Sequence, residues 1–504
     1  MNAPSLHIAE DAAPERRGRS LLDADPGPTV LVILLLAILV VRVIALAVSH
    51  AELFFDEAQY WAWAQEPAFG YYTKPPLIAW IIGATTSLCG DTPFCVRLPS
   101  PLMHFLTSLV IYAIGVKLYS RRAGFWAALV YALMPGTSIS ATLMSTDVPL
   151  LLFWAIGMLA IVHHVERPSL AAGALLGLAI GLGLNAKYAM IYLPLCYAAY
   201  ACGSPKARAT PKHPGTWVAL AVALLLIAPN LIWNAQHQFA TFEHTRENAN
   251  WDGRFPNILG LLAFLGTQVA IAGPVPFAAF TLAAIGRAPS MQGAVDGDRR
   301  RFLLAMSLPV FLLIATQALI SKANGNWAAT GFPALALLAA AAMLILQWRR
   351  GMIFTLGLSV VLLFGISFAG SFAGAFTAGP IGRELGKMVG WGDFAGKVRA
   401  LADQNDLKRV VFISRGLTAS MIYELRDSNL DIRAYVENPN APGDHFEMTR
   451  PWTATDHGPV LLVFVGGEPL PAAIASRARL VEQFRTDIFI ARKTGGTASA
   501  YRID

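Results

Sequence analysis

Long runs of apolar residues with almost no polar break recur along most of the chain. Clear examples are the segments 30–41, 219–228 and 334–346. With their flanks, several of these runs reach the ~20 residues that a helix needs to cross a bilayer. Only 14% of the residues are charged, whereas soluble domains carry roughly a quarter. The sequence therefore predicts a multi-pass α-helical membrane protein.

The apolar runs can be divided into individual membrane spans. We expect about eleven transmembrane helices, near 28–50, 101–118, 123–141, 148–165, 169–185, 188–202, 215–233, 257–285, 302–320, 327–347 and 351–373. No small-residue cleavage site closes the first run, so it is predicted to be an anchor rather than a signal peptide. The polar residues 1–27 are predicted to form a disordered cytoplasmic tail.

The net charge of +7 follows this topology. With the N-terminus in the cytoplasm, most loop arginines and lysines lie inside, for example Arg16, Arg121 and Arg299. This asymmetry is the positive-inside rule, so the basic surplus does not predict a nucleic-acid partner. The alanine-rich, cysteine-poor composition is compatible with a bacterial inner membrane. We therefore expect a multi-pass inner (plasma) membrane protein whose partners include membrane lipids.

The predicted outer loops hold the polar residues that need an explanation; these loops are 51–100, 142–147, 186–187, 234–256 and 321–326. The first is long, so we expect short helices that lie along the membrane interface. Its aromatic side chains are predicted at headgroup depth; they are Trp61, Trp63, Tyr71, Tyr72 and Trp80. The working face is therefore predicted to be the outer one.

A glycine repeat in the fifth span has a structural interpretation. Gly173, Gly177 and Gly181 repeat every four residues in the fifth span. They predict close packing of helices rather than a nucleotide site, which would need a preceding strand.

Cys89 and Cys95 lie in the first outer loop, where they either form a disulfide or remain two free thiols.

Residues 380–504 differ in character from the rest of the chain. Amphipathic segments at 394–403 and 418–426 alternate with β-rich runs at 410–413, 432–436, 460–465 and 488–491. This alternation predicts a small α/β domain. An odd number of spans places it on the outer, periplasmic side, where its role is acceptor contact or structural cover.

The ordered motifs of the chain resemble the polyprenyl-phosphate-sugar-dependent glycosyltransferases of the GT-C class. The nearest groups are bacterial relatives of protein O-mannosyltransferases and the aminoarabinose transferases that modify lipid A. The matching motifs are FDE at 55–57, YYTKPP at 71–76, VRLP at 96–99, STD at 145–147, NAK at 185–187, WNAQH at 233–237 and NW at 326–327. The resemblance covers about 28–375, which would form the transmembrane catalytic domain.

This resemblance implies an inverting glycosyltransferase. The donor would be a polyprenyl-phosphate-linked sugar, and the acceptor lipid A, a glycan or another cell-envelope molecule at the outer face. Protein O-mannosyltransferases carry a β-trefoil domain in an outer loop, and no outer loop here is long enough. A protein acceptor is therefore less expected than a lipid or glycan, as in lipopolysaccharide biosynthesis.

Carried over residue by residue, the resemblance assigns Asp56 as catalytic base and Lys74 as a donor-phosphate contact. Such a carboxylate can accept the proton of the acceptor hydroxyl, although Asp56 could instead be a helix N-cap. Arg97 and Lys187 are further candidates for the phosphate, because a cation stabilises the leaving group. Both could alternatively anchor helix ends.

Other polar residues of the outer loops are candidates for substrate binding: Glu57, Tyr72, Asp147, His237 and Asn326. Glu57 could instead orient Asp56 or favour a helix start, and Asp147 could be a cap. The carboxylates are compatible with Mg²⁺ or Mn²⁺, but Lys74 already offers charge to the phosphate. We expect no metal site and no obligatory cofactor.

A polytopic transporter or lipid flippase is the alternative function. Transporters place ionisable groups or broken helices near the membrane midplane, often in repeated halves. Here the polar residues gather at the outer face, and no repeat is evident. The sequence therefore favours an enzyme, without naming its sugar or acceptor.

Overall fold

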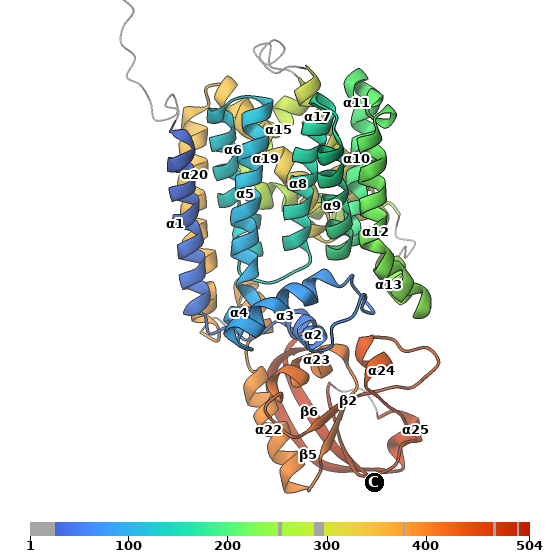
Figure 1. The fold of residues 1–504 in the computed structure, drawn as a ribbon. Helices are drawn as coiled ribbons and strands as arrows, with labels where there is room; N and C mark the ends of the chain where they lie inside the picture. The colour runs from blue at the N-terminus through green and yellow to red at the C-terminus, as the bar shows by residue number, and fades with distance from the viewer. Residues whose placement is uncertain (1–25, 250–254, 287–296, 376–378, 467–469, 491–492) are drawn as a thin grey trace, which may run out of the picture.

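The computed structural model describes residues 26–249, 255–286, 297–375, 379–466, 470–490 and 493–504. A helical bundle and a smaller C-terminal domain lie end to end, with the first-loop helices between them (Figure 1). The N-terminal end of α1 is at the far end of the bundle from the C-terminal domain. Residues 1–25, most of the predicted tail, lie outside the described residues.

The bundle consists of helices that coincide with the predicted spans. They are α1 (Gly27–Ala47), α5 (Pro99–Leu118), α6 (Arg121–Leu133), α8 (Asp147–Glu166), α9 (Leu170–Ala186), α10 (Tyr192–Gly203), α12 (Pro214–Gln236), α14 (Ile258–Ala272), α15 (Pro274–Ile285), α17 (Gly297–Ala305), α18 (Leu308–Ile320), α19 (Phe332–Ile345) and α20 (Arg349–Ser367). Shorter segments connect them: α7 (Pro135–Ser140), η2 (Tyr188–Ile191), α11 (Pro205–Ala209), η3 (Thr210–Lys212), α13 (Ala240–Ala249), η4 (Gly325–Gly331) and η5 (Ala369–Phe372).

The predicted number of spans is not confirmed by helix length. Within the described residues, 7 helices are long and apolar enough to cross a membrane, or 8 if the bent pair α14–α15 counts as one. That pair bends by 109°. The remaining predicted spans fall on α6, α9 and α10, which are helical but only 13, 17 and 12 residues long. The multi-pass architecture is confirmed, whereas the count of eleven is not.

Local sequence signals set where several of these helices begin. The hydroxyl groups of Ser120 and Ser169 accept hydrogen bonds from the backbone amides of Ala123 and Ala172, which caps α6 and α9. Such caps satisfy amides that have no partner inside a helix. The resulting ends fix which short loops the bundle presents at each face.

The glycine repeat packs α9 against α12, as predicted. A Cβ atom added at Gly173 would lie 1.9 Å from the carbonyl oxygen of Gly215, and one added at Gly177 would lie 2.5 Å from that of Ala219. Only glycine permits so close an approach of two backbones. This contact fixes the end of α9, which leads into Lys187.

The first outer loop folds into three helices, α2 (Phe55–Gln65), α3 (Leu77–Cys89) and α4 (Pro93–Arg97). The structure pairs Cys89 with Cys95 in a disulfide, with 5.9 Å between their Cα atoms. This bond joins the end of α3 to α4.

The aromatic side chains of this loop are not at an exposed interface. Trp61, Trp63 and Tyr71 are each 5% exposed or less. They pack in one core with residues of the C-terminal domain, including Tyr423 and Phe446. The C-terminal domain thus covers these three side chains, and their depth relative to the membrane stays a prediction.

The C-terminal domain is an α/β unit with a six-stranded sheet of order β3-β2-β1-β4-β6-β5. Its strands are β1 (Arg409–Phe412), β2 (Asp431–Tyr435), β3 (Pro451–Trp452), β4 (Val460–Val465), β5 (Ala478–Ile490) and β6 (Lys493–Ile503), and its helices are α21 (Gly379–Leu385), η6 (Gly386–Met388), α22 (Trp391–Gln404), α23 (Arg415–Glu424), α24 (His445–Thr449) and α25 (Ala472–Ala475). Strands β1 to β4 pair in parallel, and β6 pairs antiparallel with β4 and β5.

The domain is joined to the first loop by specific polar contacts as well as by packing. The Tyr423 hydroxyl donates to the carbonyl oxygen of Asp91 at 2.9 Å, and the Arg450 guanidinium lies 2.6 Å from the carboxylate of Glu66. Helix α23 thereby lies directly against α2 (Figure 1). The C-terminal domain consequently borders the segment that carries Asp56.

Candidate active site

Asp56 lies in the first turn of α2, where that helix meets the C-terminal domain. The N-cap residue is Phe54, whose amide donates to the carboxylate of Glu57 at 3.1 Å. Asp56 is therefore not the helix cap, which removes the alternative considered from the sequence. Its side chain is 36% exposed, and its Oδ1 lies 3.2 Å from the guanidinium of Arg415. The carboxylate is open on one side and held by a cation on the other.

Glu57 and Arg97 form a buried ion pair beneath Asp56. Their side chains are 2% and 3% exposed, and the closest N–O distance is 2.7 Å. Glu57 also accepts from the amide of Met144 at 2.9 Å, and Arg97 donates to the carbonyl oxygens of Ala51 and Glu52.

The polar groups of both side chains are paired with each other and with the backbone. Substrate binding by Glu57 and phosphate binding by Arg97 stay predictions. The pair fixes the start of α2, because every polar atom involved already has a partner within the protein.

A second carboxylate cluster brings together three residues predicted from separate motifs. Asp147 begins α8, and its Oδ1 lies 2.7 Å from the Nζ of Lys187. Its Oδ2 accepts from the amide nitrogen of Asn326 at 2.7 Å. The residues come from α8, the end of α9 and η4. Distant parts of the bundle thus converge on one polar cluster.

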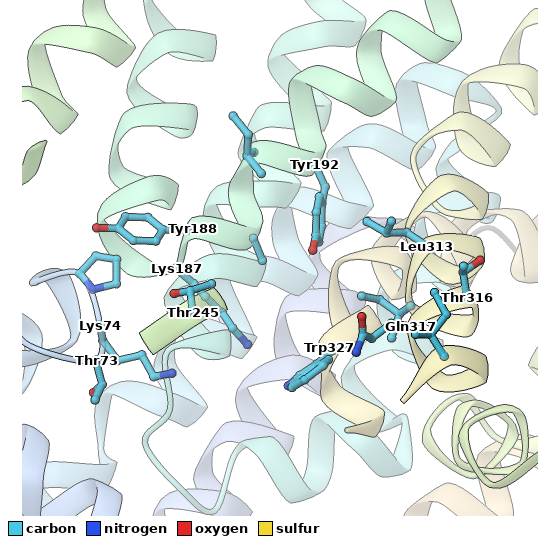
Figure 2. Close-up of a pocket in the computed structure, with 15 residues that line it drawn as sticks. Thr73, Lys74, Lys187, Tyr188, Tyr192, Thr245, Leu313, Thr316, Gln317 and Trp327 are labelled. Atoms are coloured by element: carbon cyan, nitrogen blue, oxygen red, sulfur yellow. The ribbon is translucent and has the colours of Figure 1, made fainter. Parts of the chain in front are cut away.

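A cavity of about 460 Å³ opens beside this cluster. Lys74 and Lys187 lie at one end of it, and Figure 2 shows both amino groups directed towards the same space. The opposite wall is largely apolar and includes Tyr192, Leu313 and Trp327. Among the described residues, the amine of Lys74 has no hydrogen-bond or ion-pair partner. The cavity therefore offers a cationic end and an apolar body.

The charged groups around the cavity influence one another. Burial, and then the charge of Lys187, lower the pKa of Lys74, while Asp56 and Asp147 act in the opposite direction. Burial, followed by the charges of Lys74 and Arg415, lowers the pKa of His244 to about 4. The imidazole is consequently neutral at pH 7. The charges of Asp56, Asp147, Lys187 and Arg415 thus all influence Lys74.

Two predicted substrate contacts are used elsewhere in the structure. The Tyr72 hydroxyl donates to the carbonyl oxygen of Pro442 in the C-terminal domain at 2.8 Å. The His237 ring stacks on Trp233 at 4.1 Å, and its Nδ1 is 2.8 Å from that residue's carbonyl oxygen. His237 ends α12, and it is not among the described residues that line the cavity.

Sequence reasoning missed three side chains at this site. Arg415 contacts Asp56, Gln59 accepts from Arg415 at 3.0 Å, and Tyr188 lines the cavity. Tyr188 follows the NAK motif directly, so its position was a usable signal. Arg415 lies in the C-terminal domain within no recognised motif, and nothing in the sequence singled it out.

Metal ligation was considered for the carboxylates of Asp56, Glu57 and Asp147. In the structure each of them lies against a cationic side chain instead. Over the described ranges, no group of three or more His, Cys, Asp or Glu residues could hold a metal ion.

Comparisons with known proteins agree with this architecture. The family model described as dolichyl-phosphate-mannose-protein mannosyltransferase matches residues 73–233. The lipid A galacturonosyltransferase RgtD of Rhizobium johnstonii is 34% identical over 84% of this chain and 88% of its own length. The lipopolysaccharide core galacturonosyltransferase RgtA of the same organism is 27% identical over 56% of this chain and 58% of its own length.

Solved structures show the same fold. ArnT from Cupriavidus metallidurans, bound to undecaprenyl phosphate, has a TM-score of 0.64 with 15% identity, over 94% of this chain and 98% of that one. The apo state of the same protein also gives 0.64. These relatives are glycosyltransferases, and none of the matches supports the transporter alternative. The chain belongs to the polyprenyl-phosphate-dependent GT-C glycosyltransferases.

Proposed function

We propose that the protein transfers a uronic acid, galacturonic acid, from a polyprenyl-phosphate donor to lipid A. The similarity to a lipid A galacturonosyltransferase, which aligns over most of both chains, supports the sugar and the acceptor. The donor class is supported by the fold shared with a protein solved with undecaprenyl phosphate.

The active site would face the periplasm. Helices α11 and α17, which contain Arg208 and Arg299, lie at the end of the bundle where α1 starts, whereas α2, which contains Asp56, lies at the opposite end (Figure 1). By the positive-inside rule, the basic end stays in the cytoplasm. We therefore place residues 28–375 in the inner membrane as the catalytic domain and residues 380–504 in the periplasm.

The cavity fits the two chemical parts of a lipid-linked donor. A polyprenyl phosphate combines an apolar chain with a phosphate, and the cavity combines an apolar wall with Lys74 and Lys187. Lys74 lacks a counter-ion among the described residues, so it is free to pair with a phosphate oxygen. Lys187 is neutralised by Asp147 and would contribute less charge.

Asp56 would act as the general base. The acceptor hydroxyl oxygen forms a bond to the anomeric carbon, while the bond from that carbon to the phosphate oxygen breaks. The bonding pair goes to the phosphate, and the proton of the hydroxyl goes to Asp56. Attack from the face opposite the phosphate inverts the anomeric configuration. Lys74 would stabilise the charge that grows on the phosphate.

The remaining polar residues would hold this arrangement in place. The buried pair of Glu57 and Arg97 fixes the start of α2 and hence the position of Asp56. Asn326 and Lys187 orient Asp147, whose remaining capacity as an acceptor would bind sugar hydroxyls. Such fixed supports keep a reacting group within the narrow range of productive geometries.

The mechanism is supported by a lysine, Lys74, that lines an apolar cavity without a hydrogen-bond or ion-pair partner among the described residues, and by the partly exposed carboxylate of Asp56 in the same outer loop. The test is transfer of galacturonic acid to lipid A in membranes with wild-type protein or Asp56→Asn, using polyprenyl-phosphate galacturonic acid. We expect wild type to increase the mass of lipid A by one hexuronic acid residue and Asp56→Asn to abolish this. Full activity of a folded Asp56→Asn variant would exclude Asp56 as base.

A further inference from the structure

Arg415 is the cation that contacts the candidate base, and it comes from the C-terminal domain. One guanidinium nitrogen lies 3.2 Å from Oδ1 of Asp56, and another donates to Oε1 of Gln59 at 3.0 Å. The group also lies over the ring of Phe55, 5.4 Å from its centroid. Arg415 is therefore held on three sides by the first turns of α2.

The backbone around Arg415 makes this position unfavourable for a cation without an anionic partner. Arg415 is the first residue of α23, after the N-cap Ser414. A helix N-terminus carries partial positive charge and disfavours a cation. The start of α2 packs against the start of α23: a Cβ atom added at Gly416 would lie 3.6 Å from the ring of Phe55, the first residue of α2. Two helix N-termini and a guanidinium thus converge on a place suited to an anion.

The site has one cation available for one negative charge of the donor, but not for two. Asp56 is paired with Arg415 and Asp147 with Lys187, which leaves Lys74 as the one cation of this group without a counter-ion in the described chain. Lys74 matches the single negative charge of a sugar phosphodiester. A uronic acid brings a second negative charge, which needs a second available cation.

A base that is paired with a guanidinium cannot at the same time accept a proton freely. Asp56 must therefore lose part of its contact with Arg415 before it can bind the acceptor hydroxyl. An exchange of carboxylates at Arg415 meets both requirements, because the sugar would take the guanidinium and release the aspartate. The planar fork of arginine suits bidentate binding of a carboxylate.

We propose that Arg415 determines donor specificity. When a uronic acid donor binds, the Arg415 guanidinium would exchange its ion-pair partner, from the Asp56 carboxylate to the C6 carboxylate of the sugar. This inference rests on the proposed function and extends it by a residue and a selection step. A neutral hexose would leave Arg415 on Asp56, so it would be both bound weakly and transferred slowly. The C-terminal domain thereby takes part in sugar selection.

The test compares two donors that differ only at C6, polyprenyl-phosphate galacturonic acid and polyprenyl-phosphate galactose. The measured quantity is the ratio of their kcat/KM values with lipid A as acceptor, for wild type, Arg415→Met and Arg415→Lys. Loss of a charge-assisted bidentate contact predicts a roughly 10- to 100-fold fall of this ratio in Arg415→Met. Arg415→Lys should lie between the two, because it retains charge without the fork.

The matched control is Arg409→Met. Arg409 is an ion-paired arginine of the same domain, 2.9 Å from Asp431, and the exposure of the pair is similar, at 38% and 36% against 32% and 36% for Arg415 and Asp56. The ratio should be unchanged in this control. A merely structural role of Arg415 would reduce turnover of both donors alike and leave the ratio constant.

Three outcomes would overturn the inference. The first is an unchanged ratio in folded Arg415→Met, and the second is a change that depends on the phosphate groups of the acceptor rather than on the donor. The third applies if Arg415→Met does not fold: it is an Arg415→Lys variant whose ratio of kcat/KM values for the two donors equals that of wild type. Wild-type protein that prefers the galactosyl donor would instead refute the proposed function itself. Preference for the uronyl donor together with an unchanged variant ratio refutes only the role of Arg415.

Discussion

The buried pair of Arg97 and Glu57 allows a quantitative prediction. Replacing Arg97 by methionine leaves the Glu57 carboxylate, which is 2% exposed, without its cation. Removal of one partner of a buried pair costs about 3–5 kcal/mol. Arg97→Met also removes the donors to the carbonyl oxygens of Ala51 and Glu52. We therefore expect a loss of stability in this range, with a fall in kcat because the first turn of α2 carries Asp56.

A double-mutant cycle separates the pair from the rest of the network. In Glu57→Gln/Arg97→Met both charges are absent, so the total loss should be smaller than the sum of the two single losses by about 1–3 kcal/mol. The assay is the thermal unfolding midpoint of detergent-purified protein, with transfer activity measured on the same samples. Both readouts should change together.

The control is a surface ion pair with the same N–O distance. Lys117 and Glu166 also lie 2.7 Å apart, but they are 32% and 46% exposed. Lys117→Met should change stability by less than about 1 kcal/mol, since exposed pairs contribute little. Additive losses in the cycle, or an Arg97→Met variant as stable as this control, would refute the assigned role of the pair.

Three further predictions concern charge at and near the site. Lys74→Met should lower kcat/KM for the donor by roughly 10²–10³-fold, and kinetics like wild type would exclude Lys74 from the phosphate site. Burial and then Glu52 raise the pKa of Glu424 to about 7, so the native state binds the extra proton between pH 4.5 and 7 and stability falls as pH rises through 7. Glu424→Gln should flatten that dependence in thermal unfolding scans at pH 6 to 8, and an unaltered slope would contradict it. Transfer should continue in EDTA, because each site carboxylate already faces a cation; loss of activity that Mg²⁺ or Mn²⁺ restores would show a metal requirement.

The sequence named the members of the cluster around Asp147 but not their contacts. Lys187 follows Asp147 by 40 residues and Asn326 by 179, and each lies in a motif whose order along the chain matches a known family. The motifs placed all three residues at the outer face. That Lys187 and Asn326 both bind the Asp147 carboxylate is visible only once the bundle is closed.

The sequence could not separate buried from exposed charges. Arg97 and Lys74 are both cations in the same outer loop. Arg97 forms a buried ion pair with Glu57, whereas Lys74 lines the cavity. Likewise, Trp61 and Trp63 fit a membrane interface and a protein interface equally well, since both favour aromatic side chains. For Trp61 and Trp63, the docking of the C-terminal domain decides the matter.

Within the C-terminal domain, the sequence indicates β1, β2, β4 and the last residues of β5, but not β3, the rest of β5 or β6. Strand β6 shows why. Its segment contains the polar, glycine-containing stretch KTGGTASA, which has low intrinsic strand propensity. It forms a strand because β4 and β5 pair with it on both sides. Pairing of that kind depends on partners distant in the sequence, which local patterns do not reveal.

The contact between α2 and α23 has a consequence for how the enzyme is made. Gln59 and Arg415, which hydrogen-bond to each other, are 356 residues apart. A ribosome must therefore release nearly the whole chain before the pocket around Asp56 can close. Partly synthesised or truncated chains that lack α23 would carry the helices of the bundle without Arg415 beside Asp56. Activity then becomes a report that the last domain has folded and docked.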